Sequence, residues 1–158
     1  MLLLLLLAGC ASRPATPAGP SVRPEVPDDA FITQRAVLTI RGRQFALNGY
    51  LARSRERGMR LIVAGNLGAP LADVLVKPDG RVFVMRSSPM FREEWIREHV
   101  AADLKSLFGD MPDGAVVTSP EPGVFRLERR RYQLEVRLVE TRPGPQAAGL
   151  FEEGAAAP

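Results

Sequence analysis

Hydrophobic and polar residues alternate with a period of two along the first half of the chain, which predicts a series of β-strands. Between residues 44 and 53, for example, Phe45 and Leu47 share one side while Asn48 falls on the other. Short turns rich in glycine and charged residues separate the runs, as in an antiparallel meander. The predicted strands are 36–40, 44–53, 58–66, 71–77 and 81–86.

The pattern changes to a helical period between residues 89 and 108. Apolar side chains recur there at spacings of three and four, which places them on one stripe of an amphipathic helix. We predict Ser88 as the N-cap, Pro89 as the first helical residue and Gly109 as the C-cap. The stripe comprises Ile96, Val100, Leu104, Leu107 and Phe108, and it is widened by Phe91 and Trp95.

Period-two alternation returns after a link rich in proline and glycine. Residues 123–140, GVFRLERRRYQLEVRLVE, predict a β-hairpin whose turn contains Arg129, Arg130 and Arg131. The element order is therefore strands, one helix and further strands, without an internal repeat. This order predicts an α+β fold in which a curved antiparallel sheet, an incomplete barrel, has one main helix covering its apolar face.

Both ends of the chain are poor in large apolar residues. Residues 11–27 are rich in Pro, Ala and Ser, a composition that cannot bury a core and is typical of a tether. Residues 143–158 have a similar composition, and only Leu150 and Phe151 are large enough to make a short contact. We therefore expect a folded domain over 28–142 and a disordered tail over 143–158.

The first ten residues, MLLLLLLAGC, predict a processing signal. The six-leucine run is too short for a bilayer span, which needs about 20 apolar residues, and it fits the end of a signal-peptide apolar region. Leu7-Ala8-Gly9-Cys10 resembles the bacterial lipobox, which implies lipid attachment to Cys10 and cleavage after Gly9. The alternative is a frayed apolar end with an incidental cysteine. No Lys or Arg precedes the leucines, so we expect the true start codon to lie upstream.

The lipobox divides the N-terminal region into two parts. Residues 1–9 are the remnant of a signal peptide, and residues 10–27 are a lipidated, proline-rich tether. Two or more acyl chains anchor a protein stably in a membrane, whereas one gives only marginal binding. Ala11 follows the cysteine, and by resemblance to Gram-negative lipoproteins the lack of Asp there favours export to the outer membrane.

The net charge of +3 is consistent with an acidic partner, and equally with arginine usage set by a GC-rich genome, in which case the charges are simply solvated. An exported lipoprotein does not meet nucleic acid, so anionic lipid or lipopolysaccharide headgroups are the available anions. Arg129, Arg130 and Arg131 form the candidate headgroup site, because three consecutive arginines resemble a phosphate clamp. The alternative is that these side chains are simply solvated at a turn.

The sequence shows no pattern of catalytic residues. The single histidine, His99, lies in the predicted helix, and the single cysteine is used for the lipid. Paired histidine ligands, nucleophile motifs and a glycine-rich phosphate loop are all missing from the sequence. We interpret Asp73, within a predicted strand, as an outward-facing carboxylate. The sequence therefore predicts a protein that is not an enzyme and has neither a metal site nor a cofactor.

Several segments together resemble one family. They are the lipobox, the proline-rich tether, LTIRGRQFALNGYLA, MRLIVAGNLGAPLADVLV, DGRVFV and FREEWIREHVAADLKSLFG. The chain resembles the LolA/LolB superfamily of lipoprotein carriers and receptors over roughly residues 34 to 140, and it is most similar to the outer-membrane receptor type. The resemblance implies an incomplete barrel around an apolar cavity for acyl chains. It also implies that Leu67, in GNLGAP, projects to assist insertion of cargo into the membrane.

Two functions remain open at this point. The leading one is a monomeric lipoprotein on the periplasmic face of the outer membrane that binds lipid or acylated cargo, with a periplasmic carrier protein as a partner. The alternative is a structural or assembly accessory lipoprotein with a solid core, which binds a protein partner. A cavity lining and a packed core share the same alternation, and Leu67 either projects or packs half-buried on a neighbouring strand. The predicted cavity lining is Phe45, Leu47, Leu61, Val63, Trp95 and Leu134.

Overall fold

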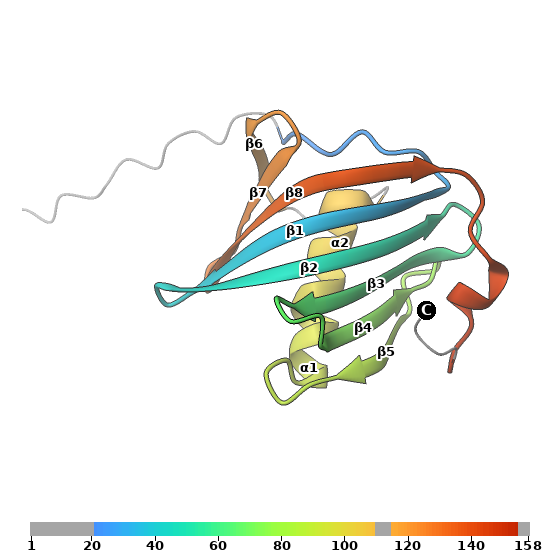
Figure 1. The fold of residues 1–158 in the computed structure, drawn as a ribbon, viewed down its shortest axis with the longest axis horizontal. Helices are drawn as coiled ribbons and strands as arrows, with labels where there is room; N and C mark the ends of the chain where they lie inside the picture. Colours follow the sequence, from blue (N-terminus) through green and yellow to red (C-terminus); the bar gives the residue numbers. More distant parts are fainter. Residues whose placement is uncertain (1–20, 110–114, 155–158) are drawn as a thin grey trace, which may run out of the picture.

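The computed structural model describes residues 21–109 and 115–154, and these form an eight-stranded antiparallel sheet with one long helix (Figure 1). The strand order is β5-β4-β3-β2-β1-β8-β7-β6, so the sheet is open, with β5 and β6 at its edges. The fold class is therefore α+β, as predicted. The strands are β1 (Ala30–Ile40), β2 (Arg43–Ser54), β3 (Gly58–Gly65), β4 (Pro70–Val76), β5 (Val82–Ser87), β6 (Val117–Glu121), β7 (Val124–Glu128) and β8 (Tyr132–Pro143).

The predicted five-strand meander and the hairpin after the helix are both present, but two strand predictions were wrong. β1 begins at Ala30, six residues before the predicted start. The polar pair Gln34 and Arg35 interrupts the apolar pattern there, next to a shift in the β1–β8 register. β6 lies in the segment that we predicted to be a link. It pairs only with β7, and its Pro120 is tolerated because an edge strand leaves one row of N–H groups unpaired.

The long helix begins four residues later than predicted. It consists of α1 (Glu93–Trp95), the π-helical turn η1 (Ile96–Val100) and α2 (Ala101–Phe108). Ser88 does not cap it, because its carbonyl accepts the Phe91 N–H at 3.0 Å and closes a tight turn around Pro89 instead. Gly109 ends the helix as predicted. A Cβ atom there would lie 2.6 Å from the Lys105 carbonyl oxygen, so glycine is the residue that fits.

The helix lies against one face of the sheet, here called the inner face (Figure 1). The predicted stripe is confirmed, since Ile96, Leu104, Leu107 and Phe108 are all buried in the core cluster that the helix shares with the sheet. Alternate residues of β1 to β4, such as Ile32, Leu51, Leu61 and Val74, supply the other side of this core. The apolar side chains that produce the period-two pattern of the strands and the helical pattern therefore pack together in one core.

The opposite, outer face of the sheet is partly covered by the C-terminal segment, which corrects the prediction of a disordered tail. Residues Ala148–Phe151 form the short 3-10 helix η2, and Phe151 is only 2% exposed. Its ring packs in a second cluster with Ala52 and Leu75. Arg60 donates to the Leu150 carbonyl at 3.1 Å and Lys77 to the Phe151 carbonyl at 2.6 Å. The side chains of Leu150 and Phe151 and the hydrogen bonds to their carbonyl groups therefore order this segment, although its composition is typical of a disordered tail.

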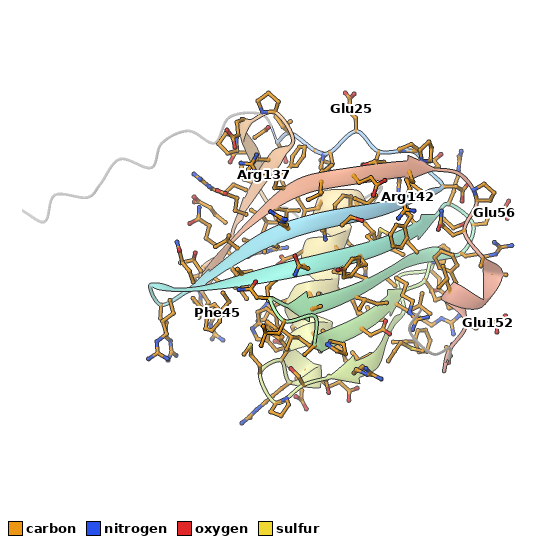
Figure 2. The ribbon with its side chains drawn as sticks, viewed as in Figure 1. Glu25, Phe45, Glu56, Arg137, Arg142 and Glu152 are labelled. Carbon is orange, nitrogen blue, oxygen red and sulfur yellow. The ribbon has the colours of Figure 1, made fainter. Side chains whose placement is uncertain are left out.

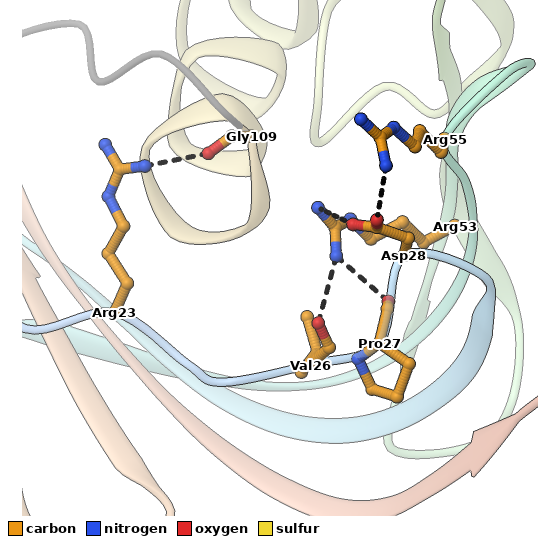
Figure 3. A network of polar contacts seen from close by, with 7 residues as sticks. All are labelled: Arg23, Val26, Pro27, Asp28, Arg53, Arg55 and Gly109. Carbon is orange, nitrogen blue, oxygen red and sulfur yellow. Dashed lines mark hydrogen bonds and ion pairs between the residues drawn. The ribbon is translucent and has the colours of Figure 1, made fainter.

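The N-terminal segment is also bound to the domain over its described part (Figure 3). The Arg23 guanidinium donates to the Gly109 carbonyl, at the C-terminus of the helix, at 2.8 Å. Arg53 of β2 donates to the carbonyls of Val26 and Pro27 at 3.1 and 2.9 Å. Residues 21–27 of the predicted tether therefore pack on the domain. The predicted signal-peptide remnant, Cys10 and the tether up to residue 20 lie outside the described residues.

Candidate functional site

A cavity of about 70 Å³ lies between the inner face and the helix. Five of the six predicted lining residues border it, namely Leu47, Leu61, Val63, Trp95 and Leu134. The sixth, Phe45, does not line it. Phe45 lies towards the β1–β2 hairpin (Figure 2), where it is half-buried against the same core. The full lining is Gln34, Ala36, Leu38, Leu47, Asn48, Gly49, Leu61, Val63, Ala72, Phe91, Trp95, Val100, Asp103, Leu104, Leu107, Phe108, Leu134 and Val136.

Small residues on the inner face create this space. Ala36 of β1, Gly49 of β2 and Ala72 of β4 all border the cavity, at inward-facing positions where a larger side chain would fill it. The helix contributes larger groups opposite them, including Trp95 and Leu104. Because packed interiors contain few voids larger than a water molecule, a cavity lined in this way is a feature of the fold that calls for an explanation.

Three polar residues are among those that border the otherwise apolar cavity, and the side chains of two of them have hydrogen-bond partners. Asn48 donates to the Gly65 carbonyl at 3.4 Å. Asp103 accepts the Tyr132 hydroxyl at 2.7 Å. The third is Gln34, which is 6% exposed and whose Oε1 has no hydrogen-bond partner among the described residues. Gln34 was not predicted as a lining residue, although it is the one polar residue at an inward position of β1.

A buried polar network joins the helix to the β7–β8 turn. Arg129 Nε donates to Asp103 at 2.9 Å, and its Nη2 donates to Ser106 at 3.1 Å. Burial raises the pKa of Tyr132 well above its usual range, and the charge of the hydrogen-bonded Asp103 raises it further. Arg129 therefore binds the helix, which corrects its prediction as a headgroup ligand. Arg130 and Arg131 are exposed on the same turn.

Aromatic rings form a continuous row beside the cavity. Phe91 and Trp95, which line it, have ring centroids 5.1 Å apart. His99 follows at 5.2 Å from Trp95 and 5.4 Å from Tyr132. These contacts place His99 at the boundary between helix surface and core. The π-helical turn over Ile96–Val100 lies in the same stretch, and such turns recur at functional positions in helices.

Four turns gather at one end of the sheet, here called the rim. Because all the strands are antiparallel, the β1–β2, β3–β4, β5–α1 and β7–β8 turns share this end (Figure 1). Leu67, in the β3–β4 turn, is 99% exposed, so the half-buried alternative was wrong. Met90, in the β5–α1 turn, is 58% exposed. The exposed side chains of Arg41, Arg130 and Arg131 lie on the other two turns.

Asp73 belongs to a separate buried site on the outer face. It is 3% exposed and forms a bidentate pair with Arg60, with nitrogen–oxygen distances of 2.7 and 3.0 Å. Hydrogen bonding to Asp73 raises the pKa of the Arg60 guanidinium. The predicted outward direction of Asp73 is confirmed, but the carboxylate lies beneath the C-terminal segment rather than in solvent. The sequence feature that could have predicted this ion pair is the presence of two opposite charges, Arg60 and Asp73, in neighbouring apolar strands.

Comparisons of the chain with protein-family models and with curated proteins find no match. Within residues 21–109 and 115–154, no helix has both the length and the apolar character needed to cross a membrane; the long helix has 16 residues. The features of the chain that bear on its function are therefore the cavity, the rim and the N-terminal sequence.

Proposed function

We propose that this chain is a lipid-anchored protein of the outer membrane's periplasmic face that binds lipid or acylated lipoprotein cargo between its sheet and helix. The observation that carries the proposal is the apolar cavity bordered by both elements. In this proposal the open sheet is the wall of an incomplete barrel, and the helix closes its apolar side. Acyl chains are the apolar ligands most abundant at a membrane surface, and a periplasmic carrier protein would deliver acylated cargo.

The volume of the cavity requires that the helix moves when a ligand enters. An apolar cavity of about 150 Å³ holds one benzene molecule, and the cavity here has about 70 Å³. A long acyl chain therefore does not fit until the helix separates from the inner face. The ligand would replace the apolar contacts that Leu104 and Trp95 make with the sheet, so the exposed apolar area stays small.

The rim is the proposed membrane-facing end of the domain. Leu67 projects fully into solvent, and a large apolar side chain in that position can enter a bilayer interface. Arg130 and Arg131 lie on a neighbouring turn and would bind anionic headgroups, each contributing about 1 kcal/mol near an anionic surface. The acyl groups on Cys10 hold the domain at the membrane, so these weaker contacts need only orient it.

Trp95 fluorescence tests the proposal directly, because Trp95 is the only tryptophan in the chain and lines the cavity. A full-length Cys10→Ser variant is titrated with a long-chain fatty acid. We expect a saturable change in emission. Ala72→Leu, which fills the cavity from β4, should reduce that change, whereas Ala46→Leu, at an exposed position on β2, should not.

The small volume of the cavity favours a second function, an accessory lipoprotein whose solid core presents surfaces to a protein partner. In that case the titration leaves the Trp95 emission unchanged while the protein remains folded by circular dichroism. Ala72→Leu would then lower the melting temperature, because additional methyl groups in a packed core cost about 1–3 kcal/mol.

A further inference from the structure

Gln34 occupies a position that the fold otherwise gives to apolar residues. It lies on the inner face of β1 between Ile32 and Ala36, opposite Gly49 of β2. It is 6% exposed and borders the cavity. Next to it, the β1–β8 register shifts between Thr33 and Gln34. A neutral amide is therefore buried in the wall of an apolar cavity.

The amide oxygen of Gln34 has no hydrogen-bond partner within the described part of the chain. The side chains of the other polar residues that border the cavity, Asn48 and Asp103, are both hydrogen-bonded, and Asn48 lies at an outward position of β2. The large majority of buried side-chain polar atoms in folded proteins are paired, because an unpaired one loses its bonds to water without compensation. The exception here belongs to a side chain that reaches the cavity.

The neighbouring strand makes room for this amide. A Cβ atom at Gly49 would lie 2.7 Å from both Cγ and Nε2 of Gln34, closer than side chains normally approach. Glycine at position 49 therefore allows the Gln34 side chain to lie against the bare backbone of β2. A leucine at position 34 would be as apolar as its neighbours on the inner face and would leave no unpaired polar atom in the cavity wall.

We infer that Gln34 is the polar anchor of the cavity and that its ligand is an aliphatic compound with an uncharged hydrogen-bond donor, a hydroxyl or an amide N–H, bonded to Gln34 Oε1. This inference rests on the proposed function, because it specifies the ligand of the same cavity. A charged headgroup is disfavoured, since Gln34 offers no opposite charge and the surrounding walls are apolar. A water molecule is a weaker occupant, because buried waters usually make about three hydrogen bonds and two of the three polar residues here are already paired.

Isomeric probe pairs test the inference. Decan-1-ol and 1-methoxynonane have the same atoms, but only the alcohol donates a hydrogen bond. N-methylnonanamide and N,N-dimethyloctanamide make the same comparison for an N–H donor, so the two pairs distinguish a hydroxylated chain from an N-acyl compound. Dissociation constants are measured by Trp95 fluorescence with the full-length Cys10→Ser chain. In the protein with Gln34 we expect the donor of at least one pair to bind about three- to tenfold more tightly than its isomer.

The matched variants are Gln34→Met, which keeps the side-chain length and removes the amide, and Gln44→Met, at an exposed position of β2. Gln34→Met should abolish the preference for the donor and should not lower the melting temperature, whereas Gln44→Met should leave the preference unchanged. Equal preferences in all three proteins, with binding intact, would overturn the role of Gln34 and leave the proposed function standing. Absence of binding by every probe to every protein would instead contradict the proposed function, and this inference with it.

Discussion

Arg60 and Asp73 show how one pair of residues supports the outer face. Their side chains are buried and bonded to each other at two points, and Arg60 also donates to the carbonyl of Leu150. The pair therefore connects β3, β4 and the C-terminal segment. Taking two charges out of water is costly, but removing one partner costs more, because the remaining charge is left buried without its counterion.

We predict that Asp73→Ala lowers the free energy of unfolding by about 3–5 kcal/mol, measured by urea denaturation. The double variant Arg60→Met/Asp73→Leu should recover most of this loss, because it removes both charges and keeps apolar volume. Asp79→Ala breaks an exposed pair with Arg81 and serves as the control. Equal midpoints for Asp73→Ala and Asp79→Ala would contradict the burial of the pair.

Tyr132 makes the stability of the fold depend on pH in the alkaline range. Burial and the charge of Asp103 raise the pKa of its phenol above the ordinary value of 10.0. Above pH 10.0 the unfolded chain therefore loses this proton while the folded chain keeps it. The unfolded state then binds fewer protons, so the stability contributed below that pH is lost as the pH rises.

We predict that the urea midpoint falls more steeply above about pH 10 in the unsubstituted chain than in Tyr132→Phe, because the variant lacks the phenol whose pKa is raised in the folded state. Tyr50→Phe, at the other tyrosine of the chain, is the control and should keep the steeper fall. Parallel curves for all three proteins would show that Tyr132 ionises equally in both states.

The residues that were not predicted share one property. Their positions depend on contacts with residues that are far away in the sequence. Leu47, Leu61 and Trp95 were predictable because a local period already assigns them to an apolar face. Gln34 breaks such a period, and its position is understandable only when Gly49 and the cavity are known. Local patterns therefore predicted five apolar residues of the cavity wall and none of its polar residues.

The same division holds for whole elements. Strands with regular alternation were predicted, because burial of one face fixes their period. β6 lacks alternation, since four of its five residues are exposed and its pairing with β7 alone makes it a strand. The C-terminal segment is ordered by contacts with β3 and β4, which lie far away in the sequence. Composition records which residues a segment contains but not which distant residues it contacts. It therefore could not predict that either segment is ordered.

We predict that Phe151→Ala lowers the free energy of unfolding by about 3 kcal/mol, because a buried aromatic ring is replaced by a cavity. Val139→Ala, at a position of β8 that is 54% exposed, is the control and should change it much less. Thermal denaturation of the full-length chain measures both. A disordered tail would make Phe151→Ala equal to the control.

For the whole molecule, the two ends of the sheet differ in the residues they expose. The rim carries Leu67 and Met90 together with exposed arginines. Glu56 and Glu152 lie at the opposite end (Figure 2), where the β2–β3 turn and the C-terminal segment meet. Arg55 and Arg57 are exposed beside Glu56, so both ends of the sheet carry positive charge. Under the proposed function it is the projecting Leu67, not a difference in charge, that would turn the rim towards the membrane.

We predict that Leu67→Glu weakens the association of the Cys10→Ser chain with anionic liposomes without changing its melting temperature. The side chain is fully exposed, so burial contributes nothing to its stability. Val139→Glu introduces the same charge away from the rim and should bind liposomes as the parent does. Vesicle co-sedimentation provides the measurement. A fall in melting temperature, or equal sedimentation of both variants, would exclude membrane insertion by Leu67.

Native mass spectrometry can detect a ligand held in the proposed binding space between the sheet and the helix. The full-length Cys10→Ser chain is exported with an intact secretion signal, purified without detergent and sprayed under native conditions. We expect a population with an additional mass equal to that of a lipid or acyl compound, which Ala72→Leu should reduce and Ala46→Leu should preserve. A single species at the mass of the protein alone, from material that is folded, would contradict the claim.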